Sequence, residues 1–259
     1  MTILINNLIP NIINWIKDYA TNNKFSTLVI GISGGVDSSV VSTLCAKTNL
    51  NTIVVSMPIK QIKEQHNLSL KHGEWLEQQF NNVNHQIISL SDTFNNIQNV
   101  FTKYKYDHLH SFANTRSRLR MLTLYQIAGS TNGLVVGTGN KVEDFGVGFY
   151  TKYGDGGVDI SPIGDCLKTQ VWDMAKKLKI NKKIINAKPT DGLWDDGRTD
   201  EDQLKGLDYK KLEHAMMISE QKDNTNLDAN EKKLLKKYIS IRTPNIHKMK
   251  PVPIYKLKT

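Results

Sequence analysis

The run TLVIGISGGVDSS at residues 27–39 joins a short apolar segment, a glycine pair and a group of small polar residues without a break. Residues 27–32 are rich in β-branched side chains, which is typical of a buried parallel strand. Gly34 and Gly35 then allow the backbone conformations that a tight turn requires. The serine and aspartate residues that follow are types that cap helices. The run therefore predicts a buried strand, a turn and a helix start in immediate succession, which is a basic unit of α/β folds.

The predicted turn is suited to binding a polyphosphate. A helix N-terminus carries unsatisfied N–H groups and about half a positive charge, so a turn that ends at one favours an anion. Asp37 fits such a site when an oxygen-ligated divalent cation such as magnesium lies between its carboxylate and the phosphates. The run lacks the lysine of G-x-x-x-x-G-K-[ST] and the glycine spacing of G-x-G-x-x-G. The alternative is a strand, turn and helix in which Asp37 only caps the helix.

Composition narrows the class of protein. The chain has 259 residues, of which 39% are hydrophobic and 23% charged, as expected for one soluble α/β domain. Its net charge of +9 is spread over lysines without a dense basic block, so we expect no nucleic-acid partner. No apolar run reaches the ~20 residues of a membrane span and the N-terminus has no signal pattern, so we expect a cytoplasmic protein without membrane contact. Cys45 and Cys166 lack metal or redox spacing and are expected to be reduced thiols.

Hydrophobic patterns predict alternating strands and helices, and so a Rossmann-like parallel sheet with helices on both faces. Further strands are expected over residues 52–57, 86–89 and 133–137, and helices over 9–19, 38–47, 61–80, 92–104, 114–127, 168–178, 209–220 and 230–241, with an extended chain from Pro244. In an open parallel sheet, ligands bind beyond the carboxyl ends of the strands. Thr138, directly after the strand at 133–137, is therefore expected beside Ser33.

Two segments without regular periodicity are expected to serve the site. Residues 141–162 are rich in glycine and charge, and a long irregular segment in a compact domain is usually functional. Residues 189–202 are acidic and rich in turn-forming types, and Trp194 within them suggests a mobile lid. In the helix at 114–127, the arginines at 116, 118 and 120 cannot all share one face, so at least one of them could point toward a site.

Six motifs together resemble ammonia-dependent NAD synthetases, a family within the ATP pyrophosphatases. They are SGGVDSS at 33–39, RSRLRM at 116–121, GTGNKVE at 137–143, TKYGDGG at 151–157, KPTDGLWDDGRTDED at 188–202, and the pair His247-Lys248. The first marks the superfamily, whereas TKYGDGG and the acidic loop are more specific. The resemblance implies a single NAD synthase domain over residues 1–259, with an ATP-binding core at about 20–180, the mobile loop at 189–202 and a helical C-terminal part at 205–259. The activity it implies is ATP-dependent amidation of deamido-NAD with ammonia, giving NAD, AMP and pyrophosphate through an acyl-adenylate.

The resemblance also assigns roles to residues. Those implied to contact ATP are Gly31, Ile32, Ser33, Gly34, Gly35, Val36, Asp37, Ser38, Thr138, Lys168 and Thr190. Asp37 and Glu143 would bind magnesium and, with Lys168, would form the catalytic group. Those implied to hold deamido-NAD are Arg118, Lys152, Asp155, Asp159, His247 and Lys248. The sequence has one residue more than the family's usual spacing between Glu143 and Thr151, so counting back from TKYGDGG points to Asp144 instead. Counting forward from GTGN points to Glu143, which we prefer because strand ends are better anchored than loops.

The resemblance further implies a homodimer, for which the apolar face of residues 9–19 could serve as interface. Free ammonia is the expected nitrogen source, because the chain has no room for a fused amidase domain and neither cysteine has a recognisable histidine partner. The alternative enzymes are other ATP pyrophosphatases that adenylate tRNA or a purine. The alternative from another class is a nucleotide-binding protein without turnover.

Overall fold

The computed structural model describes residues 5–60, 63–194, 196–221 and 226–257. Its centre is a four-stranded parallel sheet with the strand order β3-β2-β1-β4. The strands are β1 (Thr27–Gly31), β2 (Asn51–Ser56), β3 (Val83–Ile87) and β4 (Gly133–Val135). The predicted Rossmann-like α/β class is confirmed, and each of the four expected strands is present within a few residues of its predicted bounds.

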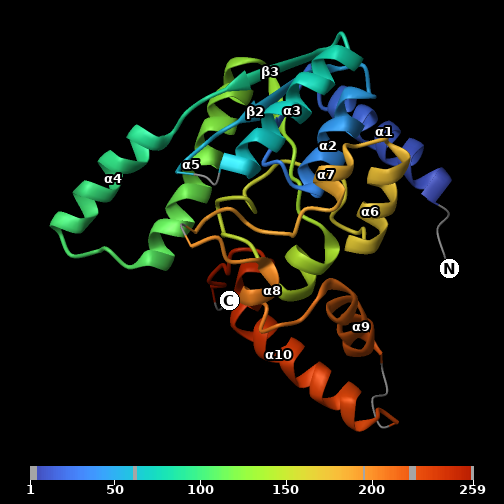
Figure 1. Ribbon diagram of the computed structural model, residues 1–259, viewed down its shortest axis with the longest axis vertical. Coiled ribbons are helices and arrows are strands. Elements are labelled where there is room, and N and C mark those ends of the chain that lie inside the picture. Colours follow the sequence, from blue (N-terminus) through green and yellow to red (C-terminus); the bar gives the residue numbers. More distant parts are fainter. Residues whose placement is uncertain (1–4, 61–62, 195, 222–225, 258–259) are drawn as a thin grey trace.

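The helices of the described chain cover both faces of this sheet and extend below it (Figure 1). They are α1 (Ile5–Asn22), α2 (Val36–Ala46), α3 (Lys63–Gln79), α4 (Ser91–Lys103), α5 (Leu109–Ser130), the π-helix η1 (Lys141–Val147), α6 (Lys168–Lys177), α7 (Lys182–Ile185), α8 (Asp200–Gln203), α9 (Tyr209–Glu220) and α10 (Ala229–Met249). The expected helix at 61–80 corresponds to α3, and residues 61 and 62 lie outside the described part. Every helix that the sequence predicts is therefore present.

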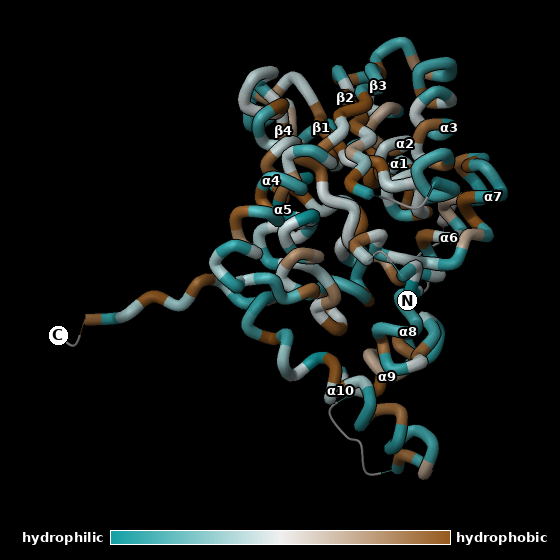
Figure 2. The backbone as a smooth tube through the Cα atoms, turned by 60° about the vertical axis from the view of Figure 1, so that its left-hand side comes forward, coloured by the Kyte–Doolittle hydropathy of each residue, from teal (hydrophilic) through white to brown (hydrophobic). Residues whose placement is uncertain are grey.

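Alternation along β1 explains why both faces are covered. Leu28 and Ile30 point into one core with α1, α2 and α6, whereas Val29 points into a second core with α4 and α5. Successive side chains of a strand point to opposite faces, so an uninterrupted apolar run requires cover on both sides. α9 and α10 build a separate apolar cluster on η1, away from the sheet (Figure 1). The residues after α10, 251–257, run out from the body of the molecule (Figure 2).

The prediction of an irregular segment at 141–162 is wrong at its start, where η1 forms a π-helical turn. The Asn140 side chain accepts hydrogen bonds from the backbone N–H groups of Val142 and Glu143, both at 3.1 Å, and so caps this turn. The turn ends at Gly148, whose φ of 66° is left-handed and favours glycine. A π-helix is rare and local, so periodicity did not predict it.

The prediction of an extended chain from Pro244 is also wrong, because α10 continues through it to Met249. A proline inside a helix removes one backbone donor and usually ends or kinks the helix. Here side chains of α10 bind carbonyl groups of η1: Tyr238 donates to Gly146 at 3.1 Å and Asn245 donates to Val147 at 3.0 Å. These tertiary bonds hold the helix in place beyond the proline.

The apolar face of the first helix packs mainly within the chain itself. Ile12 and Ile16 of α1 are 6% and 0% exposed and belong to the core that covers β1. Trp15 lies on the outer side and is 45% exposed. The predicted helix over residues 9–19 is confirmed, and its use as a subunit interface stays a prediction.

Candidate active site

The loop between β1 and α2 has the geometry of an anion site. Gly34 has a φ of 86°, and a Cβ atom there would lie 2.5 Å from the backbone oxygen of Gln65, so the loop packs directly on α3. Ser38 Oγ donates to the Gly35 carbonyl at 3.1 Å, and the N-cap of α2 is Gly35, which offers no side-chain acceptor. Asp37 does not cap the helix. The N–H groups of the first turn are therefore available to a ligand.

Two carboxylates from distant parts of the chain meet one lysine beside this loop. Lys168 Nζ lies 2.6 Å from Asp37 Oδ2 and 2.8 Å from Glu143 Oε1, and the lysine side chain is only 2% exposed. Asn140 Nδ2 donates to Asp37 Oδ1 at 3.1 Å, so the residue that caps η1 also fixes the aspartate. The start of α2, the η1 turn and the start of α6 thus converge at one point.

The first turn of α6 is held in place by hydrogen bonds from α9. Glu213 of α9 accepts from the Thr169 backbone N–H and from its hydroxyl, both at 2.9 Å. Tyr209, at the first position of α9, places its hydroxyl 2.5 Å from Glu143 Oε1. The C-terminal helical part therefore supports both Lys168 and Glu143.

Burial and charge act against each other in this cluster. Burial alone would lower the pKa of Lys168, but the charges and hydrogen bonds of Asp37 and Glu143 raise it, so the lysine is an ammonium. Burial alone would raise the pKa of Glu143, but the Lys168 charge and the hydrogen bonds from Lys168 and Tyr209 hold it below its usual value. Burial, opposed by Lys168, raises the pKa of Asp37. One ammonium faces two carboxylates, so the cluster favours an additional cation.

The donor set fits magnesium. Within the residues that the structure describes, no group of three histidine, cysteine, aspartate or glutamate side chains forms a metal cluster. Magnesium does not need one, because it is usually held by one or two carboxylates together with substrate phosphates and water. Asp37 and Glu143 offer two hard oxygen ligands, and they border the anion-binding loop.

A cleft of about 440 Å³ opens above this cluster. It is lined by every residue predicted to contact ATP: Gly31, Ile32, Ser33, Gly34, Gly35, Val36, Asp37, Ser38, Thr138, Lys168 and Thr190. Glu143 and Asp144 also line it, and so does Asp155. Glu143 shares Lys168 with Asp37, whereas the carboxylate of Asp144 lies flat on Gly139, where a Cβ atom would be 1.9 Å from its Oδ2.

The residues predicted to hold the second substrate are divided between the cleft and its surroundings. Asp155 lines the cleft and accepts from Ser117 Oγ at 2.6 Å and from the Thr151 N–H at 3.0 Å. Arg118 donates to the carbonyl oxygen of Lys152 at 3.4 Å, so the exposed Arg118 and the half-buried Lys152 lie together outside the cleft.

The remaining three predicted substrate residues make contacts within the chain. Lys248 donates to the Tyr150 carbonyl at 2.7 Å, and burial lowers its pKa despite the nearby Asp155 and Asp144. Asp159 accepts from the Val135 N–H at 2.8 Å and from the Tyr125 hydroxyl at 3.0 Å, which ties it to the end of β4. His247 Nδ1 lies 3.0 Å from the Pro244 carbonyl oxygen within α10.

The acidic loop borders the cleft through Pro189, Thr190, Asp191, Leu193 and Asp200, while Trp194 does not line it. Arg116 of α5 donates to the Leu193 carbonyl at 3.0 Å and so ties the loop to the second core. Trp194 Nε1 donates to Gln203 Oε1 at 2.9 Å, and its ring lies 5.9 Å from that of His110. Residue 195 of the predicted lid lies outside the described chain.

Three residues that contribute to the site received no individual role from the sequence. Tyr209 and Asp200 sit behind Glu143, and Arg120 lines the cleft with its Nε donating to the Met57 carbonyl at 3.2 Å. Burial and the neighbouring Arg116 lower the pKa of Arg120 to about 10. A tyrosine at a helix start carries no signal of function in one sequence. The arginine spacing did indicate a site, but did not distinguish Arg120 from Arg118.

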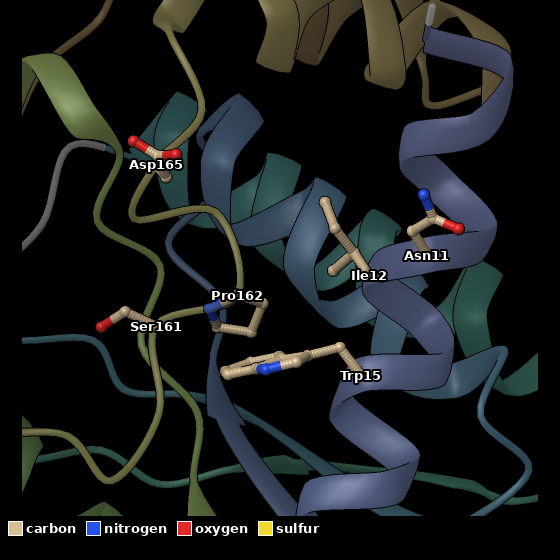
Figure 3. A pocket seen from close by; sticks show the side chains of 6 residues that line it. All are labelled: Asn11, Ile12, Trp15, Ser161, Pro162 and Asp165. Carbon is tan, nitrogen blue, oxygen red and sulfur yellow. The ribbon is translucent and has the colours of Figure 1, made fainter. Parts of the chain in front are cut away.

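A second hollow beside α1 is no candidate. Figure 3 shows Trp15 lying against Pro162, with Asp165 at the rim. Asp165 is the one charged residue among those that line it, its side chain is 95% exposed, and it pairs with Lys141 at 3.0 Å. No polar groups converge there.

Comparison with known proteins gives consistent results. The family model described as NAD synthase matches residues 8–252. The curated NH(3)-dependent NAD(+) synthetase of Carboxydothermus hydrogenoformans is 36% identical over 217 residues, covering 81% of this chain and 84% of the relative. Among solved structures, NMN synthetase from Francisella tularensis has a TM-score of 0.86 at 30% identity, covering 99% of this chain and 100% of that one. NH3-dependent NAD synthetase from Campylobacter jejuni has a TM-score of 0.78 at 25% identity, covering 98% and 100%.

Proposed function

The chain belongs to the NAD synthase family, and from this membership we propose that it converts deamido-NAD to NAD with ATP and ammonia. It is a carbon–nitrogen ligase that releases AMP and pyrophosphate. The same comparisons favour this reaction over adenylation of tRNA or a purine and over a binding protein without turnover. The single observation that carries the proposal is the convergence of Asp37, Glu143 and Lys168 at the phosphate-binding turn.

The geometry supports the first step, which is adenylation of a weak nucleophile. A carboxylate oxygen of the nicotinate attacks the α-phosphorus of ATP, an oxygen–phosphorus bond forms, and the bond from that phosphorus to the bridging oxygen of pyrophosphate breaks. The N-terminal end of α2 and the Lys168 ammonium lower the repulsion between these anions. Magnesium bound by Asp37 and Glu143 would supply further neutralisation of the phosphates.

In the second step, ammonia attacks the acyl carbon of the adenylate, and the bond from this carbon to the AMP oxygen breaks. The nitrogen loses one proton on forming the amide, and this proton passes to the solvent water. The residues of the cleft serve this step by holding the adenylate in a fixed orientation toward the incoming ammonia. A reaction between positioned groups is faster than one that depends on a random encounter in solution. We assign the ATP contacts to the eleven cleft residues named above, and the deamido-NAD contacts to Arg118, Lys152, Asp155, Asp159, His247 and Lys248.

A homodimer is part of the proposal. The arm formed by the end of α4, the start of α5 and the turn between them projects from the body of the molecule (Figure 1) and exposes Phe101, Tyr104, Tyr106 and Leu109 at 44%, 66%, 71% and 73%. Exposed apolar groups that cluster in this way mark interaction surfaces. We therefore place the subunit interface on this arm, in place of the face of α1. We further propose that the protein acts in the cytoplasm and binds no nucleic acid; none of the described helices could span a membrane.

A second candidate activity is amidation of the corresponding mononucleotide. The observation that favours it is the TM-score of 0.86 with a protein named NMN synthetase, against 0.78 with the NAD synthetase of Campylobacter jejuni. The chemistry at the carboxylate is the same for both acceptors. They differ only in whether an adenylyl group extends beyond the nicotinate ribose phosphate.

One assay tests both candidates. Purified protein with magnesium and ATP receives deamido-NAD or nicotinate mononucleotide, each with ammonium or with glutamine, and the products are separated chromatographically. We expect NAD and AMP with deamido-NAD and ammonium. A several-fold higher kcat/KM for the mononucleotide would establish the second candidate, and absence of amide product with either acceptor would contradict the assignment.

A further inference from the structure

Tyr209 lies between two carboxylates that come from different elements. Its hydroxyl is 2.5 Å from Glu143 Oε1 in η1 and 2.9 Å from Asp200 Oδ2 at the start of α8. The tyrosine is 7% exposed and Asp200 is 5% exposed, so water does not compete for these contacts. The three side chains form a continuous chain from the base of the acidic loop to the proposed magnesium ligand.

The number of protons available to these three side chains limits how they can be hydrogen-bonded. A tyrosine hydroxyl has one proton and donates one hydrogen bond, whereas an ionised carboxylate can only accept. Glu143 Oε1 also receives a bond from Lys168 at 2.8 Å, so the glutamate is the ionised partner. If the one hydroxyl proton goes to Glu143, the 2.9 Å contact with Asp200 Oδ2 needs a second proton, which a protonated Asp200 would supply by donating to the Tyr209 oxygen.

Two further observations support a neutral Asp200. Its other oxygen, Oδ1, is buried without a hydrogen-bond partner, and a buried orphan oxygen costs far less on a neutral acid than on a carboxylate. Burial and the charge of Glu143 raise the pKa of Asp200 to about 7. Both fit an acid that keeps its proton at slightly acid to neutral pH.

The tyrosine ring is fixed from several sides. Trp172 of α6 meets it edge-on, with ring centroids 5.8 Å apart, and Lys168 Nζ lies 4.6 Å from its centroid. The Asp200 backbone N–H donates to the Pro189 carbonyl at 3.1 Å, which closes the base of the acidic loop. The hydroxyl is therefore held at a constant position relative to Glu143.

We propose that Tyr209 is a positioning residue that orients the Glu143 carboxylate for the metal, and that Asp200 holds Tyr209 in this role as a neutral hydrogen-bond donor. The inference rests on the proposed function, because it takes Glu143 as a magnesium ligand. Partners of metal ligands of this kind typically change metal affinity by about 10-fold to 100-fold when they are removed.

The test measures metal binding directly. Mn²⁺ replaces Mg²⁺ as an observable probe, and its affinity is measured by electron paramagnetic resonance with the full-length protein saturated with a non-hydrolysable ATP analogue, at pH 6.5. We expect Tyr209→Phe and Asp200→Ala to weaken Mn²⁺ binding about 10-fold or more. Asp200→Asn should stay within about 2-fold of wild type, because its amide N–H can replace the acid proton.

Tyr238→Phe is the matched control. Tyr238 is also buried, and its hydroxyl also donates to η1, but to the Gly146 carbonyl and not to Glu143. This variant should lose stability without a change in Mn²⁺ affinity. An equal loss of affinity in Tyr238→Phe, or unchanged affinity in Tyr209→Phe, would show that Tyr209 has no positioning role. Affinity as weak in Asp200→Asn as in Asp200→Ala would overturn the neutral donor.

Failure of the underlying function gives a different result. If Glu143→Gln binds Mn²⁺ as tightly as wild type, Glu143 is not a ligand and the positioning role is refuted with it. Amide formation by the wild-type protein, measured separately, shows whether the enzymatic assignment still holds in that case.

Discussion

Replacing Lys168 with methionine isolates the electrostatics of the site. At an effective dielectric constant of about 20, ion pairs at the observed 2.6 and 2.8 Å are each worth about 6 kcal/mol of attraction, much of which offsets the cost of burying the charges. Removing one partner of such a buried group typically costs about 3–5 kcal/mol in unfolding free energy, because the remaining charges are uncompensated. We therefore expect Lys168→Met to lower the unfolding free energy by about 3–5 kcal/mol at pH 8.

The loss should depend on pH in a defined direction. Without the ammonium, burial and mutual repulsion are expected to place the folded-state pKa values of Asp37 and Glu143 above their unfolded values of about 4. A carboxyl group with a raised folded-state pKa stabilises the folded protein fully below about pH 4, where it is protonated in both states. This stabilisation is lost as the pH rises through the folded-state pKa. The difference between wild type and variant should thus be smaller at pH 5 than at pH 8.

Urea denaturation, monitored by circular dichroism at both pH values, measures these effects. Each series is run with and without magnesium chloride at about 10 mM. Magnesium should restore part of the stability at pH 8, because a divalent cation can take the place of the ammonium. Lys141→Met is the matched control: its pair with Asp165 is exposed, so it should cost less than about 1 kcal/mol and show no magnesium effect. A Lys168→Met loss that is independent of pH and magnesium would refute the electrostatic reasoning.

Three other outcomes are expected. Asp37→Asn should abolish amide formation while circular dichroism shows an intact fold, with the exposed Asp165→Asn as control; full activity of Asp37→Asn would contradict its assignment. Gly34→Ala should lower the unfolding free energy by about 1–3 kcal/mol, because φ is 86° and the new Cβ would meet the Gln65 oxygen, and it should weaken ATP binding in calorimetry. Burial and the charge of Glu143 raise the pKa of Asp200, so the stability that its acid form contributes to the wild type is lost as the pH rises from about 4 to 7. Asp200→Asn does not titrate and should therefore gain unfolding free energy relative to wild type over that range. A difference in unfolding free energy that stays constant with pH in urea denaturation would disprove this reasoning.

The sequence predicts the part of the site that local chemistry determines. The run at 27–39 contains its own strand, turn and helix start, and the structure places all of its predicted ATP contacts in one cleft. The position of Thr138 follows from the rule that strands of a parallel sheet end at a common edge. These features depend on neighbours in the chain or on the general geometry of the sheet.

The features that were missed depend on contacts between distant segments. α10 passes Pro244 because its side chains bind carbonyl groups of η1, about a hundred residues earlier in the chain. Tyr209 and Asp200 become informative only when the fold brings them to Glu143, since each by itself is an ordinary residue at a helix start. Neither periodicity nor motif spacing in a single sequence predicts such contacts between distant segments.

The π-helical turn gives a physical reason to prefer Glu143 over Asp144 as the metal ligand. A π-turn accommodates one residue more than an α-helical turn, so η1 can absorb the extra residue before TKYGDGG without moving its start. That start is fixed by Asn140, which caps the turn and binds Asp37. We therefore infer that counting forward from the strand gives the register, in which the extra residue displaces the residues after Glu143 instead. Asp144 is the first of these, and its carboxyl group lies against Gly139 in the cleft wall, where burial and the charges of Asp155, Glu143 and Asp37 raise its pKa well above the usual value.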